Sequence, residues 1–316
     1  MNHIRRTSTR RRTAIRRPST AALALATLTV TALTACGGGG SGGGTASQSS
    51  GTGSASTSSS ASASSSTSSG TGGSGGKLTI GVPFDEPGLG LKSGDTYTGF
   101  DIDTAKYVAK ALGTSESDIT WVEANPEDRE TLLTSGKADL IVATYSITPD
   151  RKQKVDFAGP YFQAHQDLLI RRNDEDIAFG PQALNGRQLC SVTGTTSAAL
   201  VKSRFKGKID LKEYPKYSEC VQALVKGDID AVTTDDVILA GYAAQKPYKG
   251  KLKVVGKGFS DENYGVGIKK GNTEMVQKVN AALKKFIEDG SWKNSLNTNV
   301  GPSGYSIPSP PTPGSA

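Results

Sequence analysis

The chain has 316 residues, enough for one large or two modest globular lobes once its low-complexity segments are set aside. Its formal net charge is +7, from 37 lysine and arginine residues against 30 aspartate and glutamate residues. Seven of the arginines lie within residues 1–35, which contain no acidic residue, so the rest of the chain is formally neutral and its charge gives no argument for nucleic-acid binding.

Residues 1–35 have the organisation of an export signal peptide. The arginines precede an apolar stretch, Ala21 to Ala35, which is shorter than the roughly 20 residues of a membrane-spanning helix. The stretch ends in Leu33-Thr34-Ala35-Cys36, which resembles a lipobox, so we expect Cys36 to receive a lipid anchor. The alternative is a chance cysteine after a signal peptide. Secretory and twin-arginine export are both compatible with this segment.

Residues 36–76 are predicted to form a flexible tether. After Cys36 they consist almost wholly of Gly, Ser, Thr and Ala, which cannot build a core. A random coil of this length reaches about 35 Å, enough to hold a folded domain clear of a membrane surface. Whether its hydroxyl residues carry glycans is left open by the sequence.

The folded part begins with alternating strands and helices. The predicted elements are a strand at Leu78–Val82, a helix with Ile102, Ala105, Ala109 and Leu112 on one face, a strand at Trp121, a helix from Asn125-Pro126 to Gly136, and a strand at Leu140–Ala143. This order predicts an α/β fold with a mostly parallel sheet and helices on both faces.

The same alternation starts again after Gln166. We expect strands at Asp167–Ile170, Leu189–Val192, Leu211–Tyr214, Ala231–Thr233 and Leu252–Val255, with helices after Thr195, Ser218 and Asp236. A last helix carries Val276, Val279, Leu283 and Phe286 on one stripe and stops at Gly290.

Two cysteines remain once Cys36 is lipidated, Cys190 and Cys220. In an exported protein an isolated pair is most simply a disulfide. Two separate buried thiols are the alternative.

The segment from Ala138 to Phe162 holds the most informative motif of the chain. The strand Leu140–Ala143 leads into small hydroxyl residues and then Arg151, just beyond its carboxyl end, the edge at which α/β sheets bind ligands. Backbone amides, Ser146, Thr148 and a guanidinium together suit a carboxylate. The alternative is an ordinary strand–turn–helix junction with a surface arginine.

The pattern A-x-x-S-I-T-x-x-R followed by V-D-F-x-x-P-Y resembles the extracellular solute-binding proteins of ABC importers, in their polar amino-acid subfamily, and most nearly the glutamate-binding lipoproteins of Gram-positive bacteria. The resemblance runs from Lys77 to about Asn297 and implies a two-lobed, type II periplasmic-binding-protein-like fold. The chain would cross between lobes near 161–165 and 260–264. Lobe 1 would comprise 77–160 and 265–297, lobe 2 would comprise 166–259, and residues 298–316 would form a proline-rich disordered tail.

The resemblance also implies the ligand contacts. Arg151, Thr144 and Ser146, with the helix start at Thr195 and Thr196, would bind an α-carboxylate. Asp235 would pair with the α-ammonium, although Asp235 and the adjacent Asp236 could exchange the roles of ligand partner and helix cap.

Specificity is predicted to depend on Arg129, in the segment D-R-E-T-L-L, which resembles a segment of acidic amino-acid binders. An arginine fork suits a carboxylate better than an amide and favours glutamate over glutamine; aspartate is ranked behind glutamate as well. The alternative is a solvated helix arginine. The segment from Phe84 to Gly90 departs from the family pattern by placing acidic and glycine residues after Phe84. Phe84 and Asp85 are therefore candidate contacts, and the sequence leaves open whether Asp85 or Glu86 meets the ligand.

The sequence contains few residues and motifs that are typical of catalytic sites. The two histidines are His3 and His165, and the chain has no C-x-x-C, H-E-x-x-H or G-x-S-x-G motif. We therefore expect no cofactor, no metal and no enzymatic activity.

The expected function is capture of an amino acid, with glutamate favoured, by closure of two lobes at the extracellular face of the cell membrane. The protein would be a lipid-anchored monomer that delivers its ligand to the permease and ATPase subunits of an ABC importer. The alternatives are a receptor that reports the same ligand to a signalling partner and an enzyme on the same fold.

Overall fold

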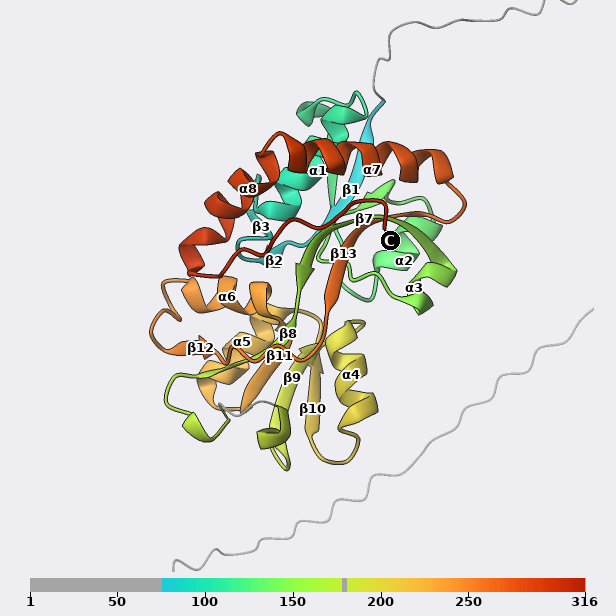
Figure 1. Cartoon of the computed structure of the whole chain (residues 1–316). Helices are drawn as coiled ribbons and strands as arrows, with labels where there is room; N and C mark the ends of the chain where they lie inside the picture. The colour runs from blue at the N-terminus through green and yellow to red at the C-terminus, as the bar shows by residue number, and fades with distance from the viewer. Residues whose placement is uncertain (1–75, 178–180, 316) are drawn as a thin grey trace, which may run out of the picture. The chain divides into compact units, whose positions relative to one another are not determined.

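The computed structural model describes residues 76–177 and 181–315 (Figure 1). The predicted signal peptide, the lipidated Cys36 and nearly all of the tether lie outside the described residues. Within the described ranges, no helix combines the length and the apolar character that a membrane crossing requires.

Lobe 1 is built on a five-stranded sheet in the order β5-β1-β6-β13-β7. β1 pairs in parallel with β5 and β6, whereas β13 runs antiparallel to β6 and β7. The strands are β1 Leu78–Val82, β5 Ile119–Glu123, β6 Leu140–Ile141, β7 Val155–Ala164 and β13 Glu262–Lys269. A small antiparallel sheet follows β1 and consists of β2 Asp85–Glu86, β3 Gly90–Ser93 and β4 Thr96–Thr98.

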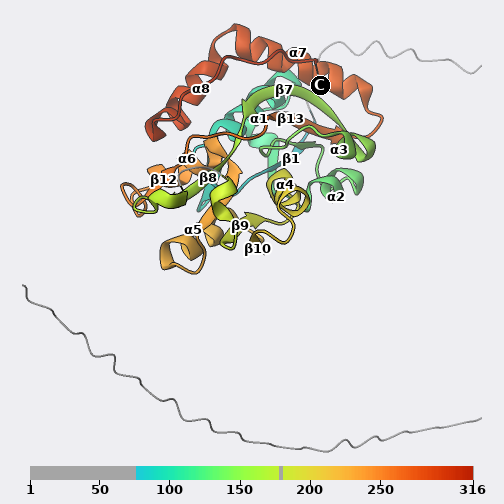
Figure 2. The ribbon, with the colours of Figure 1, turned by 60° about the horizontal axis from the view of Figure 1, so that its bottom comes forward.

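Helices cover the sheet of lobe 1. They are α1 Phe100–Ala111, α2 Arg129–Thr134, α3 Pro149–Lys154, α7 Thr273–Glu288 and α8 Ser291–Asn299. α7 is amphipathic, buries Val279, Leu283 and Phe286, and lies on the side of lobe 1 that faces away from lobe 2 (Figure 1 and Figure 2). Its start is capped by Asn272, whose side chain accepts a hydrogen bond from the Met275 amide.

Lobe 2 contains the second five-stranded sheet, in the order β10-β9-β11-β8-β12. β9, β10 and β11 are parallel, and β8 runs antiparallel to β11 and β12. The strands are β8 Gln166–Arg171, β9 Gln188–Val192, β10 Asp210–Tyr214, β11 Ala231–Asp235 and β12 Leu252–Val254, and the helices are α4 Thr196–Arg204, α5 Tyr217–Lys226 and α6 Asp236–Ala244.

The two-lobed α/β architecture expected from the sequence is confirmed, with two differences of detail. Each sheet is mixed rather than mostly parallel, because β7 and β13 in lobe 1 and β8 and β12 in lobe 2 form antiparallel pairs. α2 begins at Arg129, later than the predicted start at Asn125-Pro126, because the residues between form a turn.

Two connections join the lobes. His165 separates β7 of lobe 1 from β8 of lobe 2, and residues 255–261 separate β12 from β13. The resemblance implied crossings near 161–165 and 260–264; the second connection starts earlier than that range, because Glu262 already begins β13.

The segment after Asn297 differs from the predicted disordered tail. α8 continues to Asn299, a 3-10 turn spans Gly301–Ser303, and Tyr305 donates a hydrogen bond to Asp236 Oδ1 at 3.1 Å. The amide of Gly314 then donates to the carbonyl of Gly159 at 2.8 Å. Proline enrichment signals an absence of helix and strand, but it does not prevent an extended segment from packing through side chains such as Tyr305.

Candidate functional site

A small cavity, with a volume of about 10 Å³, lies between the lobes. Its lining combines lobe 1 residues that follow β6 or start α2 and α3 with lobe 2 residues that follow β9, β10 and β11. The lining residues are Arg129, Thr144, Ser146, Arg151, Thr195, Thr196, Ser197, Tyr217, Thr234, Asp235 and Ile238. The carboxyl ends of strands from both sheets thus meet at one place, as the position of the motifs predicted.

Arg151 spans the boundary between the lobes. Thr148 caps α3 by accepting from the Arg151 amide and so fixes the start of this short helix. One terminal nitrogen of Arg151 donates to the Ser146 carbonyl at 2.8 Å, and the other donates to the Gly194 carbonyl of lobe 2 at 3.0 Å. This guanidinium therefore belongs to lobe 1 and contacts lobe 2 in the closed arrangement.

A second arginine, Arg129, lies close to the ring of Tyr145, as Arg151 does. Arg129 is 3% exposed, and its Cζ lies 5.1 Å from the Tyr145 ring centroid, while Arg151 Cζ lies 4.9 Å from it. The Arg129 Nε has no hydrogen-bond partner among the described residues. Arg129 is thus a buried cation at the cavity wall rather than a solvated helix arginine.

Thr144 has the one non-glycine positive φ of the described residues, 43°. Its amide donates to Asp101 Oδ2 at 2.8 Å, and Asp101 Oδ1 accepts from the Tyr161 hydroxyl at 2.8 Å. Burial raises the pKa of Asp101 to about 6. A buried carboxyl therefore holds a strained residue at the cavity wall, as often happens at functional sites.

Thr195 and Thr196 stand at the start of α4, as predicted. Thr195 is the N-cap, and its hydroxyl accepts from the Ala198 amide at 3.0 Å. Thr196 donates to Glu262 Oε2 at 3.0 Å, and Glu262 Oε1 accepts from Gln166 at 2.6 Å. Because Gln166 and Glu262 adjoin the two crossings, this wall of the cavity is tied directly to the hinge.

Asp235 and Asp236 have separate surroundings. Asp235 lines the cavity and makes no side-chain cap to α6, although it occupies the N-cap position. Its Oδ2 accepts from the Tyr264 hydroxyl, whereas Oδ1 has no partner among the described residues. Burial, and then the neighbouring charge of Glu262, raise the pKa of Asp235 well above its usual value. Asp236 instead accepts hydrogen bonds from the amides of Val237 and His165 and from Tyr305.

Phe84, Asp85 and Glu86 do not line the cavity. Phe84 packs against Tyr97, with the ring centroids 5.4 Å apart. Asp85 reaches lobe 2, where it accepts from the Ser218 amide at 3.2 Å and from Tyr242 at 3.3 Å. Glu86 is buried behind Thr144, whose hydroxyl lies 3.4 Å from its Oε1. The position of this loop therefore gives no support to Phe84, Asp85 or Glu86 as ligand contacts, and Asp85 is a contact between lobes.

Sequence reasoning missed three lining residues: Tyr217, Thr234 and Ile238. Thr234 directly precedes Asp235, and Tyr217 starts the helix after β10. The rule that located Arg151 and Asp235, namely proximity to the carboxyl end of a strand, would have found both.

The charges of the cavity suit a small zwitterion. Arg151, hydroxyl groups and the start of α4 favour an anionic group, and the unpartnered Oδ1 of Asp235 offers an acceptor for a cationic one. No group of histidine, cysteine, aspartate and glutamate side chains in the described ranges is arranged to hold a metal ion.

Comparisons with known proteins agree with this chemistry. The family of bacterial extracellular solute-binding proteins, family 3, matches residues 78–302. The glutamate-binding protein GluB of Corynebacterium efficiens is 43% identical over 236 residues, 72% of this chain and 79% of that protein. The ABC transporter glutamine-binding protein GlnH of Bacillus subtilis is 36% identical over 218 residues, 68% of this chain and 78% of that protein.

Solved structures give the same result. An ancestral arginine-binding protein bound to glutamine superposes with a TM-score of 0.65 at 34% identity, covering 72% of this chain and 98% of that one. An ancestral amino acid-binding protein described as a precursor of cyclohexadienyl dehydratase gives a TM-score of 0.63 at 32% identity, covering 71% and 95% of the two chains.

Proposed function

This chain belongs to the bacterial extracellular solute-binding proteins of family 3, and from that premise we propose that it captures glutamate between its two lobes and delivers it to an ABC importer. Its relatives include glutamate- and glutamine-binding proteins, so an amino-acid ligand is supported directly by their names. The preference for glutamate over glutamine is the more specific part of the proposal.

One observation carries the proposal: Arg151 of lobe 1 and Asp235 of lobe 2 line the same cavity. The α-carboxylate of the ligand binds Arg151, Thr144, Ser146 and the start of α4 at Thr195 and Thr196. The α-ammonium binds the unpartnered oxygen of Asp235. Because these groups come from both lobes, the ligand is fully bound when the lobes close, and closure is stabilised by its higher affinity for the closed form.

Arg129 supports the choice of glutamate. It is a buried cation at the cavity wall, and its Nε lacks a partner. A side-chain carboxylate neutralises this charge, whereas the amide of glutamine does not. A micromolar affinity corresponds to about −8 kcal/mol, which two charge-assisted contacts and several hydrogen bonds supply.

The remaining parts of the proposal concern location and partners. Lipidation of Cys36 would anchor a monomer at the extracellular face of the cell membrane, with the Gly/Ser-rich segment as its tether. The closed protein would then present its bound ligand to the permease of an ABC importer. We propose binding without catalysis, because the relatives it matches are binding proteins.

The test is a ligand screen followed by calorimetry. Thermal unfolding should shift upwards with glutamate more than with any other of the twenty amino acids, since a ligand that binds the folded state stabilises it. Amino acid recovered after incubation should be chemically unchanged. A screen in which no amino acid raises the unfolding temperature would contradict the proposal.

Arg151→Ala provides the site-specific test. We expect glutamate binding to fall at least about a hundredfold in calorimetry, because the ligand carboxylate loses its charged partner and the contact to Gly194 is lost as well. Arg187→Ala is the matched control, since Arg187 pairs with Asp176 on the surface of lobe 2. Equal affinities for the two variants would reject the site.

A further inference from the structure

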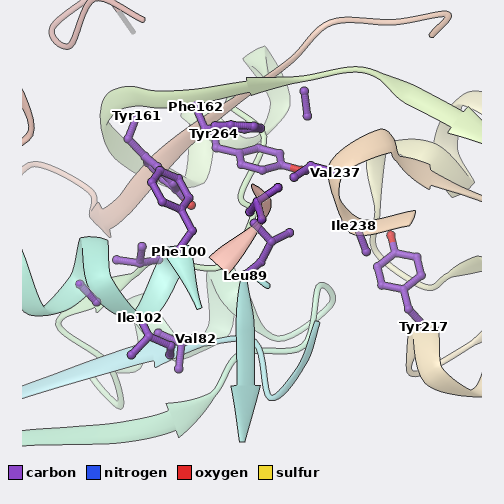
Figure 3. Packing of buried hydrophobic residues seen from close by; sticks show 14 of the residues in the cluster. Val82, Leu89, Phe100, Ile102, Tyr161, Phe162, Tyr217, Val237, Ile238 and Tyr264 are labelled. Atoms are coloured by element: carbon purple, nitrogen blue, oxygen red, sulfur yellow. The ribbon is translucent and has the colours of Figure 1, made fainter. Parts of the chain in front are cut away.

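One part of the cavity wall is not used by the α-amino and α-carboxyl groups of a ligand. It comprises Arg129 from lobe 1 and Tyr217, Thr234 and Ile238 from lobe 2. Figure 3 shows the ring of Tyr217 beside Ile238. This part of the wall is where the side chain of a bound amino acid has to lie.

Tyr217 offers a hydrogen-bond donor at this wall. The Thr234 hydroxyl donates to the Tyr217 oxygen, so the single proton of the phenol is left for another acceptor. The described residues provide no acceptor for it. Burial, and then the nearby charge of Asp235, raise the pKa of Tyr217, which keeps the hydroxyl protonated.

The donor is held in a fixed position. Tyr217 is 3% exposed and is the first residue of α5. One turn later Cys220 is joined to Cys190 of β9, and the amide of the neighbouring Ser218 donates to Asp85 of lobe 1. The start of α5 is therefore fixed within lobe 2 and contacts lobe 1 on closure, so the hydroxyl needs little ordering when a ligand arrives.

We propose that Tyr217 is a specificity-determining residue that donates a hydrogen bond to the side-chain carboxylate of the ligand, opposite Arg129. The inference rests on the proposed function and names a residue that recognises the ligand side chain. Arg129 and the Tyr217 hydroxyl are both donors, which matches the acceptor-only character of a carboxylate and disfavours the NH₂ half of an amide. Ile238 covers the methylene groups between the two ends of the ligand.

The experiment compares Tyr217→Phe with the wild type by calorimetry against three ligands, up to millimolar concentration. L-glutamate carries the side-chain carboxylate, L-glutamine carries an amide, and L-norvaline has an apolar side chain of similar length. We expect the glutamate Kd to rise about ten- to a hundredfold, the range for a lost hydrogen bond to a charged group. The glutamine Kd should rise less, and the norvaline Kd should stay within about twofold.

The matched control is Tyr214→Phe, at the end of β10 in the same lobe and outside the cavity lining. It should leave all three affinities unchanged. If Tyr217 has a merely structural role, Tyr217→Phe should lower the affinity for all three ligands equally. If Tyr217 does not contact the ligand, the variant should bind all three as the wild type does. Either result overturns the inference. If the wild type binds no amino acid, the proposed function itself fails, which is a different outcome from a Tyr217→Phe variant that binds glutamate normally.

Discussion

Asp101 does not line the cavity but contacts Thr144, which does. It is fully buried, accepts hydrogen bonds from Thr144 and Tyr161, and has its pKa raised by burial to about 6. Its ordinary value is 3.8. The carboxyl thus holds the strained backbone of Thr144 in place. Its effect on the free energy of unfolding depends on pH.

The sign of that dependence follows from the direction of the shift. A carboxyl with a raised folded-state pKa binds more protons in the folded than in the unfolded state between the two pKa values. Its contribution to the free energy of unfolding is therefore present below pH 3.8 and is lost as pH rises through about 6. One pKa unit corresponds to about 1.4 kcal/mol, so we expect a loss of about 2 to 3 kcal/mol between pH 4 and pH 7.

Urea unfolding of the wild type and of Asp101→Asn measures this loss. The free energy of unfolding of the wild type should fall relative to that of the variant as pH rises, because asparagine does not titrate. Asp95→Asn, which alters an exposed carboxylate, serves as the control. A difference between wild type and Asp101→Asn that is independent of pH would contradict the expectation.

The cavity residues that closely follow a strand could be predicted from the sequence, because the carboxyl ends of strands form the ligand-binding edge of a sheet. Arg151, Ser146, Thr195 and Asp235 all follow predicted strands, and the cavity brings them together. Phe84 and Asp85 also follow a strand, but Phe84 packs against Tyr97, and Asp85 contacts Ser218 of lobe 2. No local pattern encodes the contact of Asp85, because its partner Ser218 is 133 residues away along the chain.

At the scale of elements, the disulfide between Cys190 and Cys220 joins β9 to α5. Both sulfurs lie in the buried core. The bridge encloses a separation of 30 residues, which includes α4 and β10. It was predicted from export and cysteine number alone, and the structure contains it.

Replacing both cysteines with alanine should lower the free energy of unfolding by about 3 to 4 kcal/mol, the entropic value for a loop of this length. Chemical unfolding without reductant measures the change, and the wild type under reducing conditions should approach the variant. Labelling of the denatured, unreduced protein should reveal no free thiol among these two. Two reactive thiols would mean that the bridge does not form.

Most helices and strands could be predicted, because the spacing of apolar residues and the alternation of strands and helices are visible in short stretches of sequence. β1 was predicted from Leu78 to Val82, its observed bounds. The antiparallel placement of β7, β8, β12 and β13 was not, because the direction of a strand depends on its partners from distant parts of the chain. The ordered course of the tail depends on Tyr305 meeting Asp236, a contact across 69 residues.

At the scale of the whole molecule, glycine allows the lobes to approach. Gly241 lies in α6 of lobe 2, where an added Cβ would stand 2.1 Å from the Pro87 carbonyl oxygen of lobe 1. That oxygen belongs to the backbone and cannot move aside alone. Nearby, Lys216 of lobe 2 pairs with Glu123 of lobe 1 at 2.6 Å, so this region is a contact of the closed form.

Gly241→Ala should therefore oppose closure without harming lobe 2. Alanine favours a helix over glycine by up to about 1 kcal/mol, so the ligand-free protein should unfold at the same temperature or higher. Glutamate affinity should fall at least about tenfold, and small-angle scattering should show less compaction with ligand. Gly301→Ala, whose Cβ would meet nothing nearer than 3.9 Å, is the control. Unchanged affinity and full compaction would show that the lobes close differently.

The tail adds a third link between the lobes beside the two crossings. The family match ends at residue 302, and the chain continues past it to Tyr305, which bonds Asp236 of lobe 2 and lies 6.5 Å, centroid to centroid, from the Phe162 ring of lobe 1. Figure 1 shows the tail running from there back to β7. At β7 the amide of Gly314 donates a hydrogen bond to the carbonyl of Gly159. A segment that contacts both lobes in the closed form can restrain their separation.

We therefore expect removal of residues 304–316 to speed glutamate release. The Tyr305 contact is a hydrogen bond to a carboxylate, and its loss should raise the dissociation rate about tenfold in stopped-flow measurements. Tyr305→Phe should reproduce most of the effect, because the ring packing stays and only the bond to Asp236 is lost. Pro310→Ala, at an exposed position of the same tail, should release glutamate at the wild-type rate. If the truncated protein and Tyr305→Phe also release at that rate, the tail moves with one lobe and does not restrain opening.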